Sequence, residues 1–302
     1  MKKILVTGGA GFIGSHTVDS LLENNYHVTV YDNFTSGKLT NLNVFHPNIK
    51  IIQGDILDTT LLMKEIKCCD AVLHLAALPS VPKSIEDPIQ SLKINTMGFV
   101  QLLQVIRECN PQIRLVYASS AAVYGNASQL PCDDAIPLSG NCLSPYALEK
   151  FNNEHYAKLF ANLFGIKSLG LRYFNVYGER QDPTSPYSGV ISKFISRHKA
   201  GELITVFGDG KQSRDFISVK DVARANRLAL QNDYCGTLNI ATGVPETLLN
   251  LIRYLGIEDI KLEFASARAG DIRESYARVE QAKACLDFYY AIPAEVGIRE
   301  LI

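Results

Sequence analysis

Residues 3–15 read Lys-Ile-Leu-Val-Thr-Gly-Gly-Ala-Gly-Phe-Ile-Gly-Ser, a short apolar run followed at once by closely spaced glycines. The apolar run predicts a buried strand over Lys3–Thr7, and the pattern after it predicts a helix over Phe12–Asn24. A glycine-rich turn between a strand and a helix is typical of a dinucleotide-binding fingerprint. A glycine-rich turn that binds nothing is the alternative interpretation.

Each glycine of this fingerprint has a physical task. Gly8 allows a tight turn, Gly11 lets the backbone approach a pyrophosphate, and Gly14 allows the helix to pack closely on the strand. Phosphates are then expected at the start of the helix, beside Phe12 and Ile13, because free N–H groups and the helix dipole favour anions there.

Strand-like and helix-like segments alternate through the first 175 residues, which predicts a doubly wound parallel sheet with right-handed crossovers. After Asn175 the alternation breaks into short segments. We therefore expect an α/β protein with a Rossmann-type sheet and a smaller, mixed C-terminal substrate lobe. The sheet domain is expected at 1–175, with 215–242 returning to it, and the substrate lobe at 176–214 and 243–302. The expected strands are Lys3–Thr7, His27–Asp32, Ile49–Gln53, Ala71–Leu75, Ile113–Ala118, Ser168–Arg172 and Thr237–Ile240, and the further helices are Thr59–Lys67, Ser91–Cys109, Pro145–Phe164 and Val219–Leu230.

Acidic residues follow the second and third strands, where a nucleotide would meet the sheet. Asp32, with Asn33 after it, is placed to accept the adenosine ribose hydroxyls and to repel a 2′-phosphate, so the sequence favours NAD over NADP. Asp55, with Ile56 after it, is placed to meet adenine. An N-cap of the following helix is an equally good interpretation of Asp55.

Composition excludes several classes of function. The chain has 30 basic and 31 acidic residues and a net charge of -1, with no basic run, so neither nucleic acid nor an anionic membrane surface is an expected partner. No apolar stretch is long enough to span a bilayer. The seven cysteines are scattered without metal-ligand spacing, so we expect free thiols, no metal and a cytoplasmic location.

Tyr146 and Lys150 are separated by one helical turn and therefore share a helix face. A lysine cation beside a phenol favours the phenolate, so we expect Lys150 to lower the pKa of Tyr146 and to make it a proton-transfer group. Alone, the pair could equally be a surface pair.

Three further blocks end predicted strands, at the edge where an open α/β sheet binds its ligands. They are Leu73-His74-Leu75-Ala76-Ala77, Tyr117-Ala118-Ser119-Ser120-Ala121-Ala122-Val123-Tyr124-Gly125 and Leu171-Arg172-Tyr173-Phe174-Asn175-Val176-Tyr177-Gly178. Together with the glycine fingerprint, these blocks resemble the extended short-chain dehydrogenase/reductase family, and within it the nucleotide-sugar 4-epimerases. The resemblance runs from Lys3 to about Leu301.

The resemblance implies specific roles for residues of this chain. Ser120, Tyr146 and Lys150 match the family's catalytic positions, and Arg214 and Arg268 match two arginines that hold a diphosphate. Such guanidiniums suit a diphosphate because each donates two parallel hydrogen bonds. The other implied cofactor-binding residues are Leu75, Ala76, Ala77, Asn95 and Tyr173, and the other implied substrate-binding residues are Lys83, Asn175, Asp271 and Ser275.

The residues after Ser120 distinguish a 4-epimerase from a related 4,6-dehydratase. Related 4,6-dehydratases carry acidic residues just after the serine position, where this chain has Ala121 and Ala122. Alanine can neither remove nor donate a proton. The resemblance therefore implies a redox-neutral epimerase that oxidises the sugar at C4, lets the 4-keto sugar turn over and reduces it on the other face.

Ser275 matches a position that lines the sugar pocket near C2. A small residue there resembles enzymes that accept N-acetylated sugars, and the segment 77–88 resembles the same branch, although Pro79 departs from it. The expected substrate is UDP-N-acetylglucosamine, converted to UDP-N-acetylgalactosamine. UDP-glucose or UDP-glucuronate as substrate, a non-catalytic NAD-binding protein, and a net oxidoreductase are the alternatives.

The resemblance also implies a homodimer paired through the helices near Ser91–Cys109 and Pro145–Phe164. Apolar faces on those helices could equally belong to the core. A role in polysaccharide biosynthesis rests on analogy alone.

Overall fold

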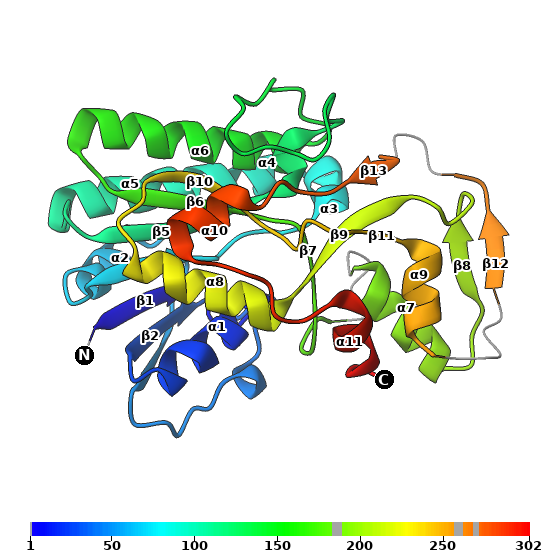
Figure 1. Ribbon diagram of the computed structural model, residues 1–302. Helices are drawn as coiled ribbons and strands as arrows, with labels where there is room; N and C mark the ends of the chain where they lie inside the picture. Colours follow the sequence, from blue (N-terminus) through cyan, green and yellow to red (C-terminus); the bar gives the residue numbers. More distant parts are fainter. Residues whose placement is uncertain (1, 183–188, 257–261, 268–271) are drawn as a thin grey trace.

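A seven-stranded parallel sheet forms the centre of the computed structural model, which describes residues 2–182, 189–256, 262–267 and 272–302 (Figure 1). The strand order is β10-β6-β5-β4-β1-β2-β3, so the order reverses between β1 and β4. A crevice at that switch point is where open α/β sheets bind ligands. The strands are β1 (Lys3–Thr7), β2 (His27–Asp32), β3 (Ile49–Gln53), β4 (Ala71–His74), β5 (Arg114–Ser120), β6 (Ser168–Tyr173) and β10 (Gly236–Ile240).

Helices cover both faces of the sheet because its strands are apolar on both sides. In β1, Ile4 and Val6 belong to the core on one face and Leu5 belongs to the core on the other. The first face is covered by α1 (Phe12–Glu23), α8 (Val219–Gln231) and α10 (Glu280–Leu286), and the second by α2 (Thr59–Ile66), α5 (Gly98–Cys109) and α6 (Pro145–Phe164) (Figure 1). Within the described part of the chain, no helix combines the length and the apolar character that a membrane span needs.

The expected strands and helices of this sheet are present, with most ends within two residues of the prediction. The helix expected over Ser91–Cys109 is instead three joined pieces, α4 (Pro88–Leu92), a π-helical turn (Lys93–Met97) and α5. A π turn inserts an extra residue into a helix and is common at functional sites. Here the inserted turn carries Asn95, whose side chain is 2% exposed and fully hydrogen-bonded to protein groups.

The smaller lobe is built on short strands with mixed pairing, as the broken pattern after Asn175 predicts. β9 (Ser213–Ser218) pairs with β7 (Asn175–Tyr177), β11 (Pro245–Thr247) and β13 (Glu274–Ser275), and β8 (Ile204–Phe207) pairs with β12 (Leu262–Ala265). Its helices are α7 (Val190–Lys199), α9 (Leu248–Tyr254) and α11 (Ala294–Arg299), drawn on the right of Figure 1. Shorter elements elsewhere are α3 (Val81–Glu86) and two 3-10 turns, Leu39–Asn41 and Ala121–Tyr124.

The C-terminal segment differs from the expected division into lobes, which assigned all of 243–302 to the substrate lobe. Helix α10 packs on α8 and β10, and its Ala282 and Leu286 join the sheet core. The chain then crosses to the smaller lobe and ends in α11. The crossing is held by Asp221 of α8, whose buried carboxylate accepts hydrogen bonds from the backbone N–H groups of Ala291 and Ile292.

We expect Asp221→Ala to lower the free energy of unfolding by roughly 2 kcal/mol, because the buried carboxylate that accepts from Ala291, Ile292 and the guanidinium of Arg224 is removed. The control is Lys220→Gln, on the adjacent residue, whose exposed pair with Glu300 should contribute less than about 1 kcal/mol. Urea unfolding of both variants measures the difference. Equal losses would show that Asp221 does not secure the crossing.

Candidate active site

The glycine loop between β1 and α1 is packed too tightly for side chains. Gly8 has φ +69, and a Cβ added to it would lie 2.7 Å from the backbone nitrogen of Ala76. A Cβ on Gly14 would lie 2.1 Å from the carbonyl oxygen of Gly8. The loop therefore meets the segment after β4, which includes Leu75 and Ala77, and the N-cap of α1 is Gly11, which has no side chain to cap the helix. This cradle fits an anionic group bound by backbone N–H groups.

Asp32 joins the end of β2 to the glycine loop. Its carboxylate accepts hydrogen bonds from the N–H groups of Ala10 at 2.9 Å and Phe34 at 2.8 Å, and the residue is buried. Because a carboxylate accepts more than two hydrogen bonds, it retains capacity for ribose hydroxyls beside the loop that it orders.

Asp55 lies next to Asn33, whose side-chain amide donates to its carboxylate at 3.0 Å. The other carboxylate oxygen accepts from the N–H of Leu57. The cap of α2 is Asp58 and not Asp55, so the N-cap interpretation of Asp55 does not describe the structure. Ile56, which follows, is buried against Gly98 at the start of α5.

Helix α6 carries Tyr146 and Lys150 to the carboxyl edge of the sheet. Ser144 caps its first turn by accepting from the N–H of Ala147, and Pro145 occupies the first helical position. The Lys150 ammonium donates to the carbonyl of Ala118 in β5 at 2.9 Å and lies 5.9 Å from the centre of the Tyr146 ring. The two side chains therefore share one face, as their spacing predicts.

Ser120, the last residue of β5, completes the group. Its hydroxyl accepts from the N–H of Ala122 at 3.2 Å, and its side chain acts to lower the pKa of the Tyr146 phenol. Ala121 and Ala122 form the 3-10 turn that follows. The structure thus brings Ser120, Tyr146 and Lys150 together, with no acidic group in the turn beside them.

The pKa of Tyr146 differs from the expectation. Burial raises this pKa above its ordinary value, and the hydrogen bond with Ser120 opposes the rise. Burial also lowers the pKa of Lys150 to about 8. Desolvation disfavours the charged form of both groups, and the spacing of the two residues in the sequence does not reveal it.

A buried ion pair joins α6 to β6 next to this group. Glu154, one turn after Lys150, binds Arg172 of β6 through two hydrogen bonds of 2.9 and 2.7 Å and accepts from the hydroxyl of Ser119 at 2.6 Å. Arg172 also donates to the hydroxyl of Tyr124. These residues were not singled out from the sequence, although the four-residue spacing of 146, 150 and 154 places a carboxylate on the buried face of α6 and so signals a partner.

Two expected cofactor residues are engaged inside the protein. The hydroxyl of Tyr173 donates to Asn226 of α8 at 2.6 Å, so it is directed into the core between β6 and α8. The side chain of Asn95 bonds both backbone groups of Leu78, which places it behind the loop that follows β4. On this geometry Asn95 supports that loop.

Three of the substrate candidates, Arg214, Ser275 and Asn175, lie on the sheet of the smaller lobe. Arg214 of β9 is paired with Ser275 of β13, and both are half-buried. Asn175 of β7 donates its side-chain amide to the carbonyl of Asp215 at 3.1 Å. Lys83 lies on α3 and is exposed. Arg268 and Asp271 lie outside the described residues.

Two aspartates of the smaller lobe, Asp215 and Asp209, orient loops. Asp215 is fully buried and accepts from the N–H groups of Thr242 and Gly243 at 2.8 Å. Asp209 binds Arg273 through two hydrogen bonds. Asp215 thereby fixes the turn after β10 against β9.

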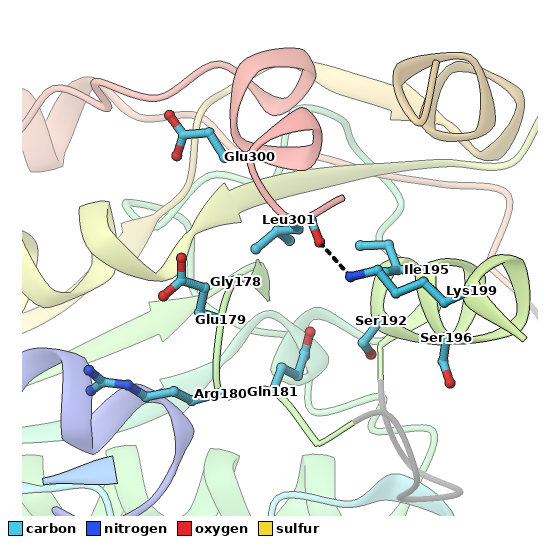
Figure 2. A pocket seen from close by; sticks show the side chains of 10 residues that line it. All are labelled: Gly178, Glu179, Arg180, Gln181, Ser192, Ile195, Ser196, Lys199, Glu300 and Leu301. Atoms are coloured by element: carbon cyan, nitrogen blue, oxygen red, sulfur yellow. Dashed lines mark hydrogen bonds between the residues drawn. The ribbon is translucent and has the colours of Figure 1, made fainter. Parts of the chain in front are cut away.

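A cavity of about 430 Å³ lies apart from the catalytic group (Figure 2). Across it, the Lys199 ammonium donates to the carbonyl of Leu301 at 3.3 Å. Its lining comes from the segment after β7, α7 and the C-terminal end, and includes none of Ser120, Tyr146 and Lys150.

Known proteins resemble the whole chain. Residues 4–241 match the NAD dependent epimerase/dehydratase family. A putative UDP-glucose 4-epimerase of Methanocaldococcus jannaschii is 40% identical, over 99% of this chain and 97% of its own length. The structure of a UDP-N-acetylglucosamine 4-epimerase from Methanobrevibacter ruminantium M1, in complex with UDP-N-acetylmuramic acid, is 40% identical with a TM-score of 0.92, covering 99% of this chain and 96% of that one. A Thermus thermophilus UDP-glucose 4-epimerase in complex with NAD is 33% identical with a TM-score of 0.87, covering 98% and 96%.

We expect Glu154→Ala to lower the free energy of unfolding by roughly 3–5 kcal/mol, because Arg172 remains buried without its partner. The matched control is Glu295→Ala, which breaks an exposed pair with Arg299 and should change stability by less than about 1 kcal/mol. Denaturant unfolding of both variants gives the comparison. A loss as small as that of the control would contradict the importance of the pair.

Proposed function

The chain belongs to the NAD-dependent epimerase/dehydratase family, and we propose that it is an NAD-dependent UDP-sugar 4-epimerase that interconverts UDP-N-acetylglucosamine and UDP-N-acetylgalactosamine. The observation that carries this proposal is the convergence of Ser120, Tyr146 and Lys150 beside the glycine loop. Three residues from two different elements meet at the edge of the sheet where its ligands bind. A protein that only bound a nucleotide would have no use for this group.

The residues that would hold NAD are those that shape the cradle. Gly8, Gly11 and Gly14 admit the pyrophosphate at the start of α1, and Asp32 accepts the ribose hydroxyls and disfavours a 2′-phosphate. When bound, NAD supplies the reversible oxidation of the sugar carbon C4. Because the reaction has no net redox change, the cofactor is regenerated in each cycle and would not need to leave the site.

Tyr146 is the group that takes the proton from the sugar 4-hydroxyl and later returns it. Ser120, at the end of β5, would hydrogen-bond the sugar oxygen as the proton moves. The Lys150 cation favours the phenolate against the effect of burial. Burial keeps water away, which protects the keto sugar from side reactions.

Ala121 and Ala122 support an epimerase over a dehydratase. They occupy the turn beside Ser120, where a dehydratase would need an acid and a base for the neighbouring carbons of the sugar. With methyl groups there, the residues around Ser120 act only on the oxygen at C4.

Ser275 supports the N-acetylated sugar. It is small, half-buried and paired with Arg214, a candidate for binding the diphosphate. Ser275 would contact the sugar C2 substituent from β13, and Arg214 would contact the diphosphate from the neighbouring strand β9. The similarity to a UDP-N-acetylglucosamine 4-epimerase agrees with this choice. The similarity to UDP-glucose 4-epimerases favours the second candidate, UDP-glucose.

Incubation with UDP-N-acetylglucosamine or UDP-glucose, without added NAD and with products identified by NMR, tests the proposal. We expect the galacto epimer of the N-acetylated sugar. Tyr146→Phe should lower kcat by about 10²-fold or more with little change in KM, because proton transfer is lost while binding is kept.

The two sugars separate the parts of the proposal. Conversion of UDP-glucose alone would keep the mechanism and reject the role of Ser275. Conversion of neither, even after NAD is added, would reject the enzyme. Near-normal turnover by Tyr146→Phe would reject the role of the tyrosine.

We also propose a homodimer that pairs through α4, the π turn and α6. These elements pack against one another and each exposes large apolar side chains, a feature of interaction surfaces. The exposed apolar residues are Ile89, Leu92, Met97, Leu148, Tyr156, Leu159 and Leu163.

The seven cysteines are all free thiols, which supports a reducing, cytoplasmic location.

The double variant Leu159→Glu/Leu163→Glu should be a monomer, because charges would have to be buried at the interface. Multi-angle light scattering after gel filtration measures the mass. Phe45→Glu, at an apolar side chain that is 94% exposed elsewhere, should leave the mass unchanged. A wild-type protein that is already monomeric would refute the dimer.

A further inference from the structure

Helix α3 is held in place by a polar side chain. Ser84 is 0% exposed and is the one buried residue among the six of α3, all of which the structure describes. The apolar side chains of Val81 and Ile85 are instead 39% and 60% exposed. Surface helices normally bury their apolar side chains, so the position of α3 depends to an unusual degree on the directional hydrogen bonds of Ser84.

Ser84 joins α3 to the backbone of the tyrosine in the catalytic group. Its hydroxyl donates to the carbonyl of Val81 at 2.7 Å and accepts from the backbone N–H of Tyr146 at 3.1 Å. A hydroxyl has one proton to donate and lone pairs that accept. Because Val81 takes the proton, the oxygen is oriented as an acceptor for Tyr146.

The first turn of α6 needs this acceptor. The first N–H groups of a helix have no partner within the helix. Pro145 has no N–H, and the N–H groups of Ala147 and Leu148 bind the hydroxyl and the carbonyl of Ser144. The N–H of Tyr146 takes its acceptor from α3, so α6 is capped partly by its own chain segment and partly by a different helix.

The segment between β4 and α3 is also fixed at its other end. The side chain of Asn95 accepts from the N–H of Leu78 at 2.7 Å and donates to the carbonyl of Leu78 at 3.2 Å. Lys83, the substrate candidate of this segment, directly precedes Ser84 and is exposed. A sugar nucleotide that contacted Lys83 would therefore bind beside the residue that holds the backbone of Tyr146.

We propose that Ser84 is a positioning residue of the active site, which couples α3 to the backbone of Tyr146 and so determines where the phenol lies relative to the sugar 4-hydroxyl. Ser84 acts through Tyr146. Such placement matters because a displacement of about 1 Å can lower turnover roughly 100-fold. The inference rests on the proposed function for its catalytic consequence, whereas the contact itself is measured without substrate.

The direct test is NMR of protein labelled with ¹⁵N-tyrosine, with the Tyr146 amide signal assigned by its loss in Tyr146→Phe. Ser84→Ala removes the acceptor, so we expect the amide proton to shift upfield and to exchange faster with solvent. Ser84→Cys keeps the site filled, but sulfur is a weak acceptor, so it should give the same change. The matched control is Ser144→Ala, which removes the acceptor of Ala147, also at 3.1 Å, and should alter the Tyr146 amide far less.

Turnover of the UDP-sugar separates positioning from capping. In both Ser84 variants we expect kcat to fall about tenfold, with KM changed less than about twofold, because proton transfer is impaired while ground-state binding is kept. Ser144→Ala weakens the same end of α6 but keeps the link to α3, so its kcat should stay close to wild type. An equal loss of kcat in Ser84→Ala and Ser144→Ala would reduce Ser84 to a helix cap and overturn the proposal.

The two measurements also distinguish this inference from the proposed function. An unmoved Tyr146 amide in both Ser84 variants overturns the inference, whether or not the protein converts a UDP-sugar. Wild-type kcat in Ser84→Cys overturns it as well, because the space filled by the side chain would then matter and the hydrogen bond would not. If the amide moves but the wild-type protein converts neither sugar, the proposed function fails and Ser84 has only a structural role.

Discussion

An ammonium group placed inside a protein loses several kcal/mol of hydration unless hydrogen bonds and opposite charge replace the water. Lys150 is in this situation, since it is 3% exposed and donates to the Ala118 carbonyl. The rest of the site is arranged around this requirement. The carbonyl belongs to the end of β5, and Tyr146 lies one turn before Lys150 on the same helix.

The docking of α6 on the sheet is what makes this arrangement possible. Its buried face carries Lys150 against β5 and Glu154 against Arg172 of β6, so one helix aligns the ends of two strands. Ser119 and Ser120 are neighbours in β5 with different roles, since the hydroxyl of Ser119 donates to Glu154 and Ser120 acts on the pKa of Tyr146. A shift of the helix would disturb the ion pair and the catalytic group together.

The smaller lobe depends on the sheet in a comparable way. Asp215 of β9 bonds the turn that follows β10, the last strand of the sheet. This contact places Arg214 and Ser275 relative to the carboxyl edge where Tyr146 lies. The C-terminal segment adds a second connection, because α10 packs on the sheet domain before the chain returns to α11.

The strands, the glycine loop, the shared face of Tyr146 and Lys150 and the absence of acids after Ser120 were predictable from the sequence, because each depends on local spacing or on the intrinsic properties of a residue type. The other features of the site depend on how segments distant in the chain pack together and bury its side chains. The direction predicted for the pKa of Tyr146 was wrong, because removal of water from the phenol depends on segments distant in the chain. The π turn, the partners of Glu154 and the place of α10 also required contacts between distant elements. Spacing along the chain determined which side chains could meet, and tertiary packing determined their solvation and therefore their charge.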